Sequence, residues 1–214
     1  MPDPSVPHPR TAAEHRQDGR IRAVVDAVLP AVDGGRFAAK CVAGEPFKVT
    51  GHCFTDGHDV LQARLCWRPE GGDWQELVMK ALPNDVWEAS FVPPALGRYE
   101  YTVEAWVDPF DSWRHDMARR VDPADIRIAC RVGAQEIEAA AQRAHGADRE
   151  ALARWARQLL AAATAADPAA ADLKSLALDE TLAATARRHP DRRFATRFVP
   201  HLPLVAERPR ARFS

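Results

Sequence analysis

Four stretches between residues 46 and 107 alternate between apolar and polar positions with a period of two. Because successive side chains of a strand point to opposite faces, this pattern predicts antiparallel strands with one buried and one solvated face. Turn signals at 56–57, 71–72, 83–85 and 96–97 separate the stretches. The predicted inward positions are Phe47, Val49, Gly51 and Cys53; Leu61, Ala63, Leu65 and Trp67; Trp87, Ala89 and Phe91; and Tyr99, Tyr101, Val103, Ala105 and Val107. Six or seven strands over about 100 residues indicate an immunoglobulin-like sandwich, which we assign to residues 20–128.

The period changes to that of a helix in residues 129–190, where apolar residues recur every three or four positions. One stripe comprises Leu152, Trp155, Ala156, Leu159, Leu160 and Ala163. Asp148, Asp167 followed by Pro168, and Asp179 are predicted helix starts, and Pro190 is a predicted stop. With a further helix near 133–145, the segment predicts a small bundle. The expected fold class is therefore α+β, an immunoglobulin-like antiparallel β-sandwich followed by a small α-helical bundle.

The two ends of the chain lack periodicity. We expect residues 1–19 to form a flexible tail, because they are rich in Pro, His and charge. Residues 191–214 carry Pro and Arg and are interpreted as a linker.

Composition narrows the class of protein. The 214 residues carry a net charge of −1, so no basic field exists to attract nucleic acid. No apolar run is long enough for a membrane span, and the first residues lack the apolar core of a secretory signal. The four cysteines show no regular spacing and are expected to be reduced thiols. A cytoplasmic protein fits best.

No group of residues predicts catalysis, a cofactor or a metal. His52 and Cys53 are strand neighbours that point to opposite faces, and with His58 they fit no usual zinc spacing. Glu100 and Glu104 share a strand face about 13 Å apart, which exceeds the carboxylate separations of glycosidases. No nucleophile elbow or phosphate-binding loop occurs.

Trp106 is a weak substrate-binding candidate because it lies on the strand face opposite the predicted core. Its ring could stack on a sugar of an α-glucan, or another domain could cover it. We favour the second alternative, since large apolar side chains outside a core usually mark a partner.

The segment "DPFDSWRHD" at 108–116 is interpreted as a docking loop, because Asp108-Pro109 ends the preceding strand. Phe110, Trp113 and Arg114 are its predicted interface residues. Trp155 joins them as an interface candidate, although we favour a core position for it, because a helix in a small bundle must bury one stripe.

Four strings together resemble one family: "FTDGHDVLQARLCWRP", "LGRYEYTVEAWVDPFDSWRHD", "HPDRRFATRF" and "ERPRARFS". They are similar to the N-terminal region of the α-1,4-glucan:maltose-1-phosphate maltosyltransferases, bacterial enzymes of the α-amylase superfamily. The resemblance covers residues 20–214. It implies a sandwich into which, or after which, a helical bundle is set, followed by a catalytic (β/α)₈ barrel.

The resemblance also implies a function. Family members transfer maltosyl units from maltose 1-phosphate to the non-reducing end of an α-1,4-glucan, with retention, and their N-terminal domains help to form a homodimer. A barrel needs about 250 residues, so the catalytic residues are expected beyond Ser214 and none is assigned here. We therefore expect a non-catalytic assembly and dimerisation region, inactive alone; the alternative is an α-glucan-binding module. A free-standing hydrolase is disfavoured.

Overall fold

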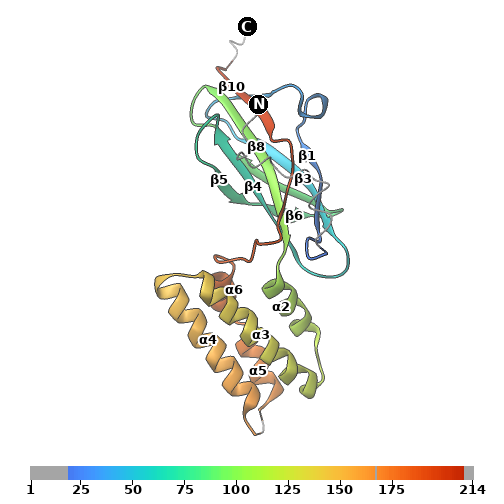
Figure 1. Ribbon diagram of the computed structural model, residues 1–214, viewed down its shortest axis with the longest axis vertical. Coiled ribbons are helices and arrows are strands. Elements are labelled where there is room, and N and C mark those ends of the chain that lie inside the picture. Colours follow the sequence, from blue (N-terminus) through green and yellow to red (C-terminus); the bar gives the residue numbers. More distant parts are fainter. Residues whose placement is uncertain (1–18, 167, 210–214) are drawn as a thin grey trace, which may run out of the picture. The chain divides into compact units, whose positions relative to one another are not determined.

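A computed structural model describes residues 19–166 and 168–209 (Figure 1). Of the predicted tail and linker, residues 1–18 and 210–214 lie outside the described residues. The described chain divides into two compact units. The first contains residues 19–56, 61–106 and 194–209, and the second contains residues 57–60 and 107–193. The chain therefore leaves the first unit, forms the second, and returns to the first.

The first unit is built from two sheets. One sheet has the strand order β1 (Ala23–Leu29), β3 (Phe47–Thr55), β7 (Val86–Phe91) and β6 (Lys80–Leu82). The other has the order β2 (Ala39–Val42), β10 (Leu202–Glu207), β8 (Gly97–Val107), β4 (Leu61–Pro69) and β5 (Gln75–Val78), with β9 (Thr196–Arg197) paired to β8. The pairs β1–β3, β3–β7, β6–β7, β4–β5, β8–β10 and β8–β9 are antiparallel, and the pair β2–β10 is parallel. The predicted fold class is confirmed.

The predicted alternation is borne out in the sandwich core. Phe47, Val49 and Cys53 of β3 are buried together with Leu65 and Trp67 of β4. The Tyr99 hydroxyl, at the start of β8, donates to the carbonyl of Ala95 at 2.9 Å and accepts from its amide at 3.2 Å. A tyrosine that bonds back to upstream backbone in this way is typical of immunoglobulin-like sandwiches.

Strands β9 and β10 differ from the linker predicted for residues 191–214. Leu202, Leu204 and Ala206 of β10 are buried in the sandwich core. Between Leu202 and Glu207 the chain alternates as a strand does, but six residues with a proline at 203 are too short a signal to stand out. The sandwich therefore closes with residues that follow the helices in the chain.

The second unit consists of helices, with bounds α2 (Pro109–Arg119), α3 (Pro123–Arg143), α4 (Gly146–Thr164), α5 (Ala170–Ala177) and α6 (Glu180–Ala186). Helix α2 and the start of α3 lie within residues 20–128, which were predicted to form the sandwich, so helical structure begins about twenty residues before 129. The expected helix near 133–145 is the second half of α3.

The docking loop predicted at 108–116 is wrong, because this segment is helix α2. Asp108 is its N-cap, with a side-chain oxygen 2.9 Å from the amide of Asp111, and Pro109 occupies the first turn. Asp122 and Pro123 start α3 in the same way. Proline after aspartate therefore starts a helix here as well as ending a strand.

The predicted caps of the later helices have mixed outcomes. Asp179 caps α6 as predicted, accepting from the amide of Leu182 at 2.8 Å. The prediction that Asp148 is an N-cap is wrong, since His145 is the N-cap of α4 and Asp148 lies in the first turn of that helix. Pro168 lies before α5, which begins at Ala170, and Asp167 lies outside the described residues.

Candidate functional site

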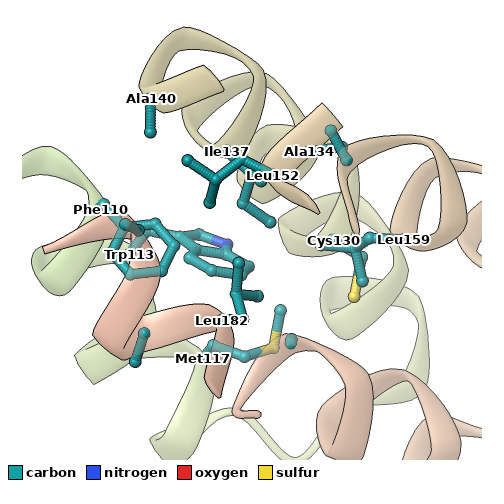
Figure 2. Packing of buried hydrophobic residues seen from close by; sticks show 14 of the residues in the cluster. Phe110, Trp113, Met117, Cys130, Ala134, Ile137, Ala140, Leu152, Leu159 and Leu182 are labelled. Carbon is teal, nitrogen blue, oxygen red and sulfur yellow. The ribbon is translucent and has the colours of Figure 1, made fainter. Parts of the chain in front are cut away.

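Trp113 lies at the centre of the helical unit's core (Figure 2). Its indole nitrogen donates to the carbonyl of Ala129 at 2.7 Å, which joins α2 to α3. The ring lies directly against Gly133, where an added Cβ would come within 1.9 Å of Trp113 Cζ2. Phe110 is also buried, with its ring centroid 5.7 Å from that of Trp113. Both predicted docking residues therefore pack inside their own unit.

Arg114 also points inward. Its guanidinium donates to the carbonyls of Ala177, Leu178 and Asp179 at 2.9–3.2 Å and pairs with Glu180 at 2.9 Å. Carbonyls at the end of a helix have no partner within it, so Arg114 satisfies the end of α5. Burial lowers the pKa of Arg114, and the charge of Glu180 opposes this. We conclude that Arg114 fastens α2 to the α5–α6 junction.

Trp106 is 4% exposed. The guanidinium carbon of Arg64 lies 5.6 Å from its ring centroid. Stacking on a sugar needs an open ring face, so the structure gives no support to Trp106 as a substrate-binding residue. An interface role for Trp106 stays a prediction.

The predicted wet face of β8 is largely covered. The Thr102 hydroxyl donates to the carbonyl of Phe198 at 2.7 Å, and Glu104 pairs with Arg197 at 2.7 Å. Glu100 pairs with Arg68, also at 2.7 Å. Both glutamates are therefore held by arginines.

Trp74 is partly exposed, but two arginines form cation–π contacts with its ring. The guanidinium carbons of Arg68 and Arg197 lie 4.4 and 5.6 Å from the ring centroid, and His201 packs edge-on at 4.8 Å. No open aromatic face for a glucan is evident at this residue.

Trp155 is partly buried and packs against the helical core, as its place on the stripe suggests. Its neighbour on that stripe, Leu160, is instead 46% exposed. An interface role for Trp155 stays a prediction.

Helices α3 and α4 form a groove of about 570 Å³ on the helical unit. Its lining residues are Arg131, Ala134, Gln135, Glu138, Ala139, Gln142, Ala156, Arg157 and Leu160. On the same side of α3, Ile128 and Val132 are 60% and 46% exposed. Sequence reasoning missed this surface, because these two apolar residues stand beside the stronger core stripe of the same helix.

Two further expectations concern metals and membranes. Among residues 19–166 and 168–209, no three His, Cys, Asp or Glu side chains are grouped so as to hold a metal ion. In the same part of the chain, no helix has the length and apolar character needed to cross a bilayer. The four cysteines are free thiols, and burial raises the pKa of Cys53 to about 12 and that of Cys130 to about 11.

Comparison with known proteins gives one consistent result. Residues 21–208 match the family model described as "Alpha-1,4-glucan:maltose-1-phosphate maltosyltransferase, domain N/S". A maltosyltransferase of that name from Myxococcus xanthus is 40% identical over 196 residues, which cover 89% of this chain and 29% of the relative. The one from Chlorobaculum tepidum is 38% identical over 199 residues, which cover 92% of this chain and 29% of the relative. A Streptomyces coelicolor relative is 37% identical over 217 residues, which cover 97% of this chain and 31% of the relative.

The chain thus spans about 30% of the length of the curated relatives it matches. The matched region takes in both the sandwich and the helical unit, including the strands that follow the helices. The chain belongs to the α-1,4-glucan:maltose-1-phosphate maltosyltransferase family, and it corresponds to the family's N-terminal N/S domain region.

Proposed function

We propose that this chain is the non-catalytic assembly region of a retaining maltosyltransferase, and that its helical unit forms the two-fold contact of a homodimer. The whole protein would transfer maltosyl units from maltose 1-phosphate to the non-reducing end of an α-1,4-glucan, in the cytoplasm and without a cofactor. Family membership supports the proposal that the chain is a region of such a maltosyltransferase. The span of about 30% of the relatives' length supports placing catalysis in the remainder.

The observation that carries the dimer is the exposed face along α3 and α4. Ile128, Val132 and Leu160 are exposed apolar side chains on these two helices, and Leu160 also lines the groove; we call these three residues the α3–α4 strip. Exposed apolar surface on a folded unit often marks a protein interface.

The charges beside the strip suit a two-fold axis. Arg131 and Glu138 lie about two turns apart on α3, and Arg157 faces them from α4. In a two-fold contact each copy presents the same surface, so a patch must be complementary to itself. A surface with both signs of charge meets this condition, because an arginine of one copy can pair with the glutamate of the other.

The test is the mass of the 214-residue chain by light scattering across a dilution series. We expect a dimer of twice 23.7 kDa, and we expect Ile128→Ser combined with Leu160→Ser to shift it to monomer. Val78→Ser is the matched control, because Val78 is an exposed apolar residue of the other unit. A monomeric wild type at every concentration, or a dimer that survives the double substitution, would contradict the dimer.

Catalysis and glucan binding are tested on the same sample. We expect no phosphate release from maltose 1-phosphate in the presence of maltoheptaose. We also expect no change of Trp fluorescence on titration with maltoheptaose. A quench that saturates would instead favour the glucan-binding alternative.

A further inference from the structure

A second group of exposed apolar side chains lies on the first unit, on strand β1 and its neighbour β3 and in the loop that follows β1. Its members are Val24, Leu29, Val32, Phe37 and Phe54, each between 41% and 55% exposed. We call these five residues the β1 patch. They were not singled out by the sequence pattern, because each lies on the outward side of a strand or in a loop.

The register of β1 and β3 places three members on one face. Val24 pairs with Phe54, and Leu29 pairs with Thr50, across the two strands. The intervening partners Val28 and Gly51 point into the sandwich. Val24, Phe54 and Leu29 therefore share the outer face of the four-stranded sheet.

The loop after β1 carries the other two members in a strained conformation. Asp33, Gly34 and Gly35 have φ values of 51°, 65° and 92°, and Asp33 is not a glycine. Val32 and Phe37 are joined across the loop by an isolated bridge, and the Tyr101 hydroxyl donates to the carbonyl of Pro30. The loop is thus held in one conformation that leaves Phe37 55% exposed. Backbone held in this sparsely populated region is often found at functional surfaces.

The loop also lies beside the last described strand. A Cβ added at Gly35 would come within 2.6 Å of Leu202, so the loop passes close over β10. Phe37 is followed by β2, which pairs with β10 from Leu204 to Glu207. In the relatives, about 70% of the length lies outside the region that matches this chain.

We propose that the β1 patch is the docking surface for the catalytic part of the longer protein, and that Phe37 is its central contact. This inference rests on the proposed function, since it assumes that the chain works within such a protein. The five side chains are themselves uncharged, and the guanidinium carbon of Arg36 lies 5.5 Å from the ring centroid of Phe37. Aromatic residues and arginine are both enriched in protein interfaces, so this loop suits a contact with the rest of the protein. The α3–α4 strip, which has charges of both signs beside it, is the surface that we assign to the second copy.

The test compares hydrogen–deuterium exchange in two proteins. One is the 214-residue chain, and the other is the Myxococcus xanthus relative with its matched region replaced by this chain. We expect amides of residues 30–38 to exchange at least about tenfold more slowly in the long protein, because coverage suppresses local opening. Residues 75–78 of β5, which are also exposed, are the internal control and should not change.

Substitutions then identify the occupant. Val32→Ser with Phe37→Ser should abolish the protection in the long protein while leaving the melting temperature of the short chain unchanged. Equal exchange of 30–38 in both proteins would overturn the proposal. A short chain whose dimer dissociates on Phe37→Ser would also overturn it, because the occupant would then be a second copy.

Two controls keep the result decisive. If the fusion does not fold, exchange is measured in the full-length relative, where the peptide aligned with 30–38 must be slower than that aligned with 75–78. Failure of the dimer is seen separately in the Ile128→Ser and Leu160→Ser masses, so the two proposals can fail independently.

Discussion

The two units bury their apolar residues in different ways. In the sandwich, six aromatic residues and several branched side chains share a core to which seven strands contribute. In the helical unit, alanine supplies ten of the twenty buried cluster members, and only two are aromatic. Small side chains let helices approach closely, but each contributes little apolar area. The helical unit should therefore depend on its few large residues far more than the sandwich depends on any one of its own.

The largest expected effect is at Trp113. Trp113→Ala removes the ring at the centre of the α2–α3 contact, together with its hydrogen bond to the carbonyl of Ala129. We expect a loss of about 3–5 kcal/mol in the free energy of unfolding, as for other buried Trp truncations. Urea denaturation followed by helical circular dichroism at 222 nm measures it. Phe47→Leu in the sandwich, where neighbouring rings remain, is the comparison and should cost clearly less.

Gly133→Ala tests the same contact from the other side. Alanine normally favours a helix over glycine by about 1 kcal/mol, but here its Cβ would meet the Trp113 ring at 1.9 Å. Overpacking of this kind costs about 1–3 kcal/mol. A Gly133→Ala protein that is more stable than the wild type would contradict the packing described. It would also contradict the claim that the helical core depends mainly on the Trp113 ring.

The sequence predicted local features well and distant ones poorly. Alternation identified the inward residues of β3, β4, β7 and β8, because burial of one sheet face imposes a period of two. Asp179 was recognised because a cap is a local signal. The return of the chain to the sandwich was not predicted, since the pairing of Glu104 with Arg197 joins residues 93 positions apart. No periodicity within either segment encodes that partner.

The candidate site shows the same limit. Phe110, Trp113 and Arg114 were recognised as apolar or charged residues in an unusual context, but were placed in a loop because Asp108-Pro109 was interpreted only as a strand end. Because the segment is helix α2, its apolar face must pack against other elements, and the other helices of the unit cover Phe110 and Trp113. The α3–α4 strip and the β1 patch could not be predicted, because the exposure of a side chain depends on which faces the rest of the fold leaves uncovered.

Arg114 gives the next expected effect. Arg114→Met removes the donor to three carbonyls at the α5–α6 junction. The Asp179 carbonyl keeps the amide of Ala183, but the carbonyls of Ala177 and Leu178 lose this partner. We therefore expect a loss of about 2–3 kcal/mol in the free energy of unfolding. Glu180→Gln is the matched control. The Glu180 side chain is 82% exposed, so its ion pair should contribute less than about 1 kcal/mol. Equal losses for both variants, measured by urea denaturation, would show that the ion pair matters more than the carbonyls.

The smallest expected effect is a pH dependence that separates the units. In the sandwich, His201 faces Trp74, Arg68, Arg197 and Glu100. Burial lowers the pKa of His201, the two arginines lower it further, and Glu100 opposes them. The unfolded chain, with a histidine pKa of about 6.5, then binds the proton more tightly than the folded one. The sandwich should therefore lose stability as the pH falls below about 6.5.

In the helical unit, the corresponding group is Asp148. Hydrogen bonds from Arg188 and His189 lower the pKa of Asp148. Its contribution to stability is complete above the unfolded pKa of about 3.9 and is lost only as the pH falls below that value. Lowering the pH from 7 to 5 should therefore destabilise the sandwich more than the helical unit. The sandwich signal is the hydrogen exchange of the β8 and β10 amides, and the helical signal is the circular dichroism at 222 nm. His201→Gln should remove this early loss, and Asp148→Asn should leave it in place. If both signals shift together and His201→Gln changes neither, then His201 does not distinguish the sandwich from the helical unit.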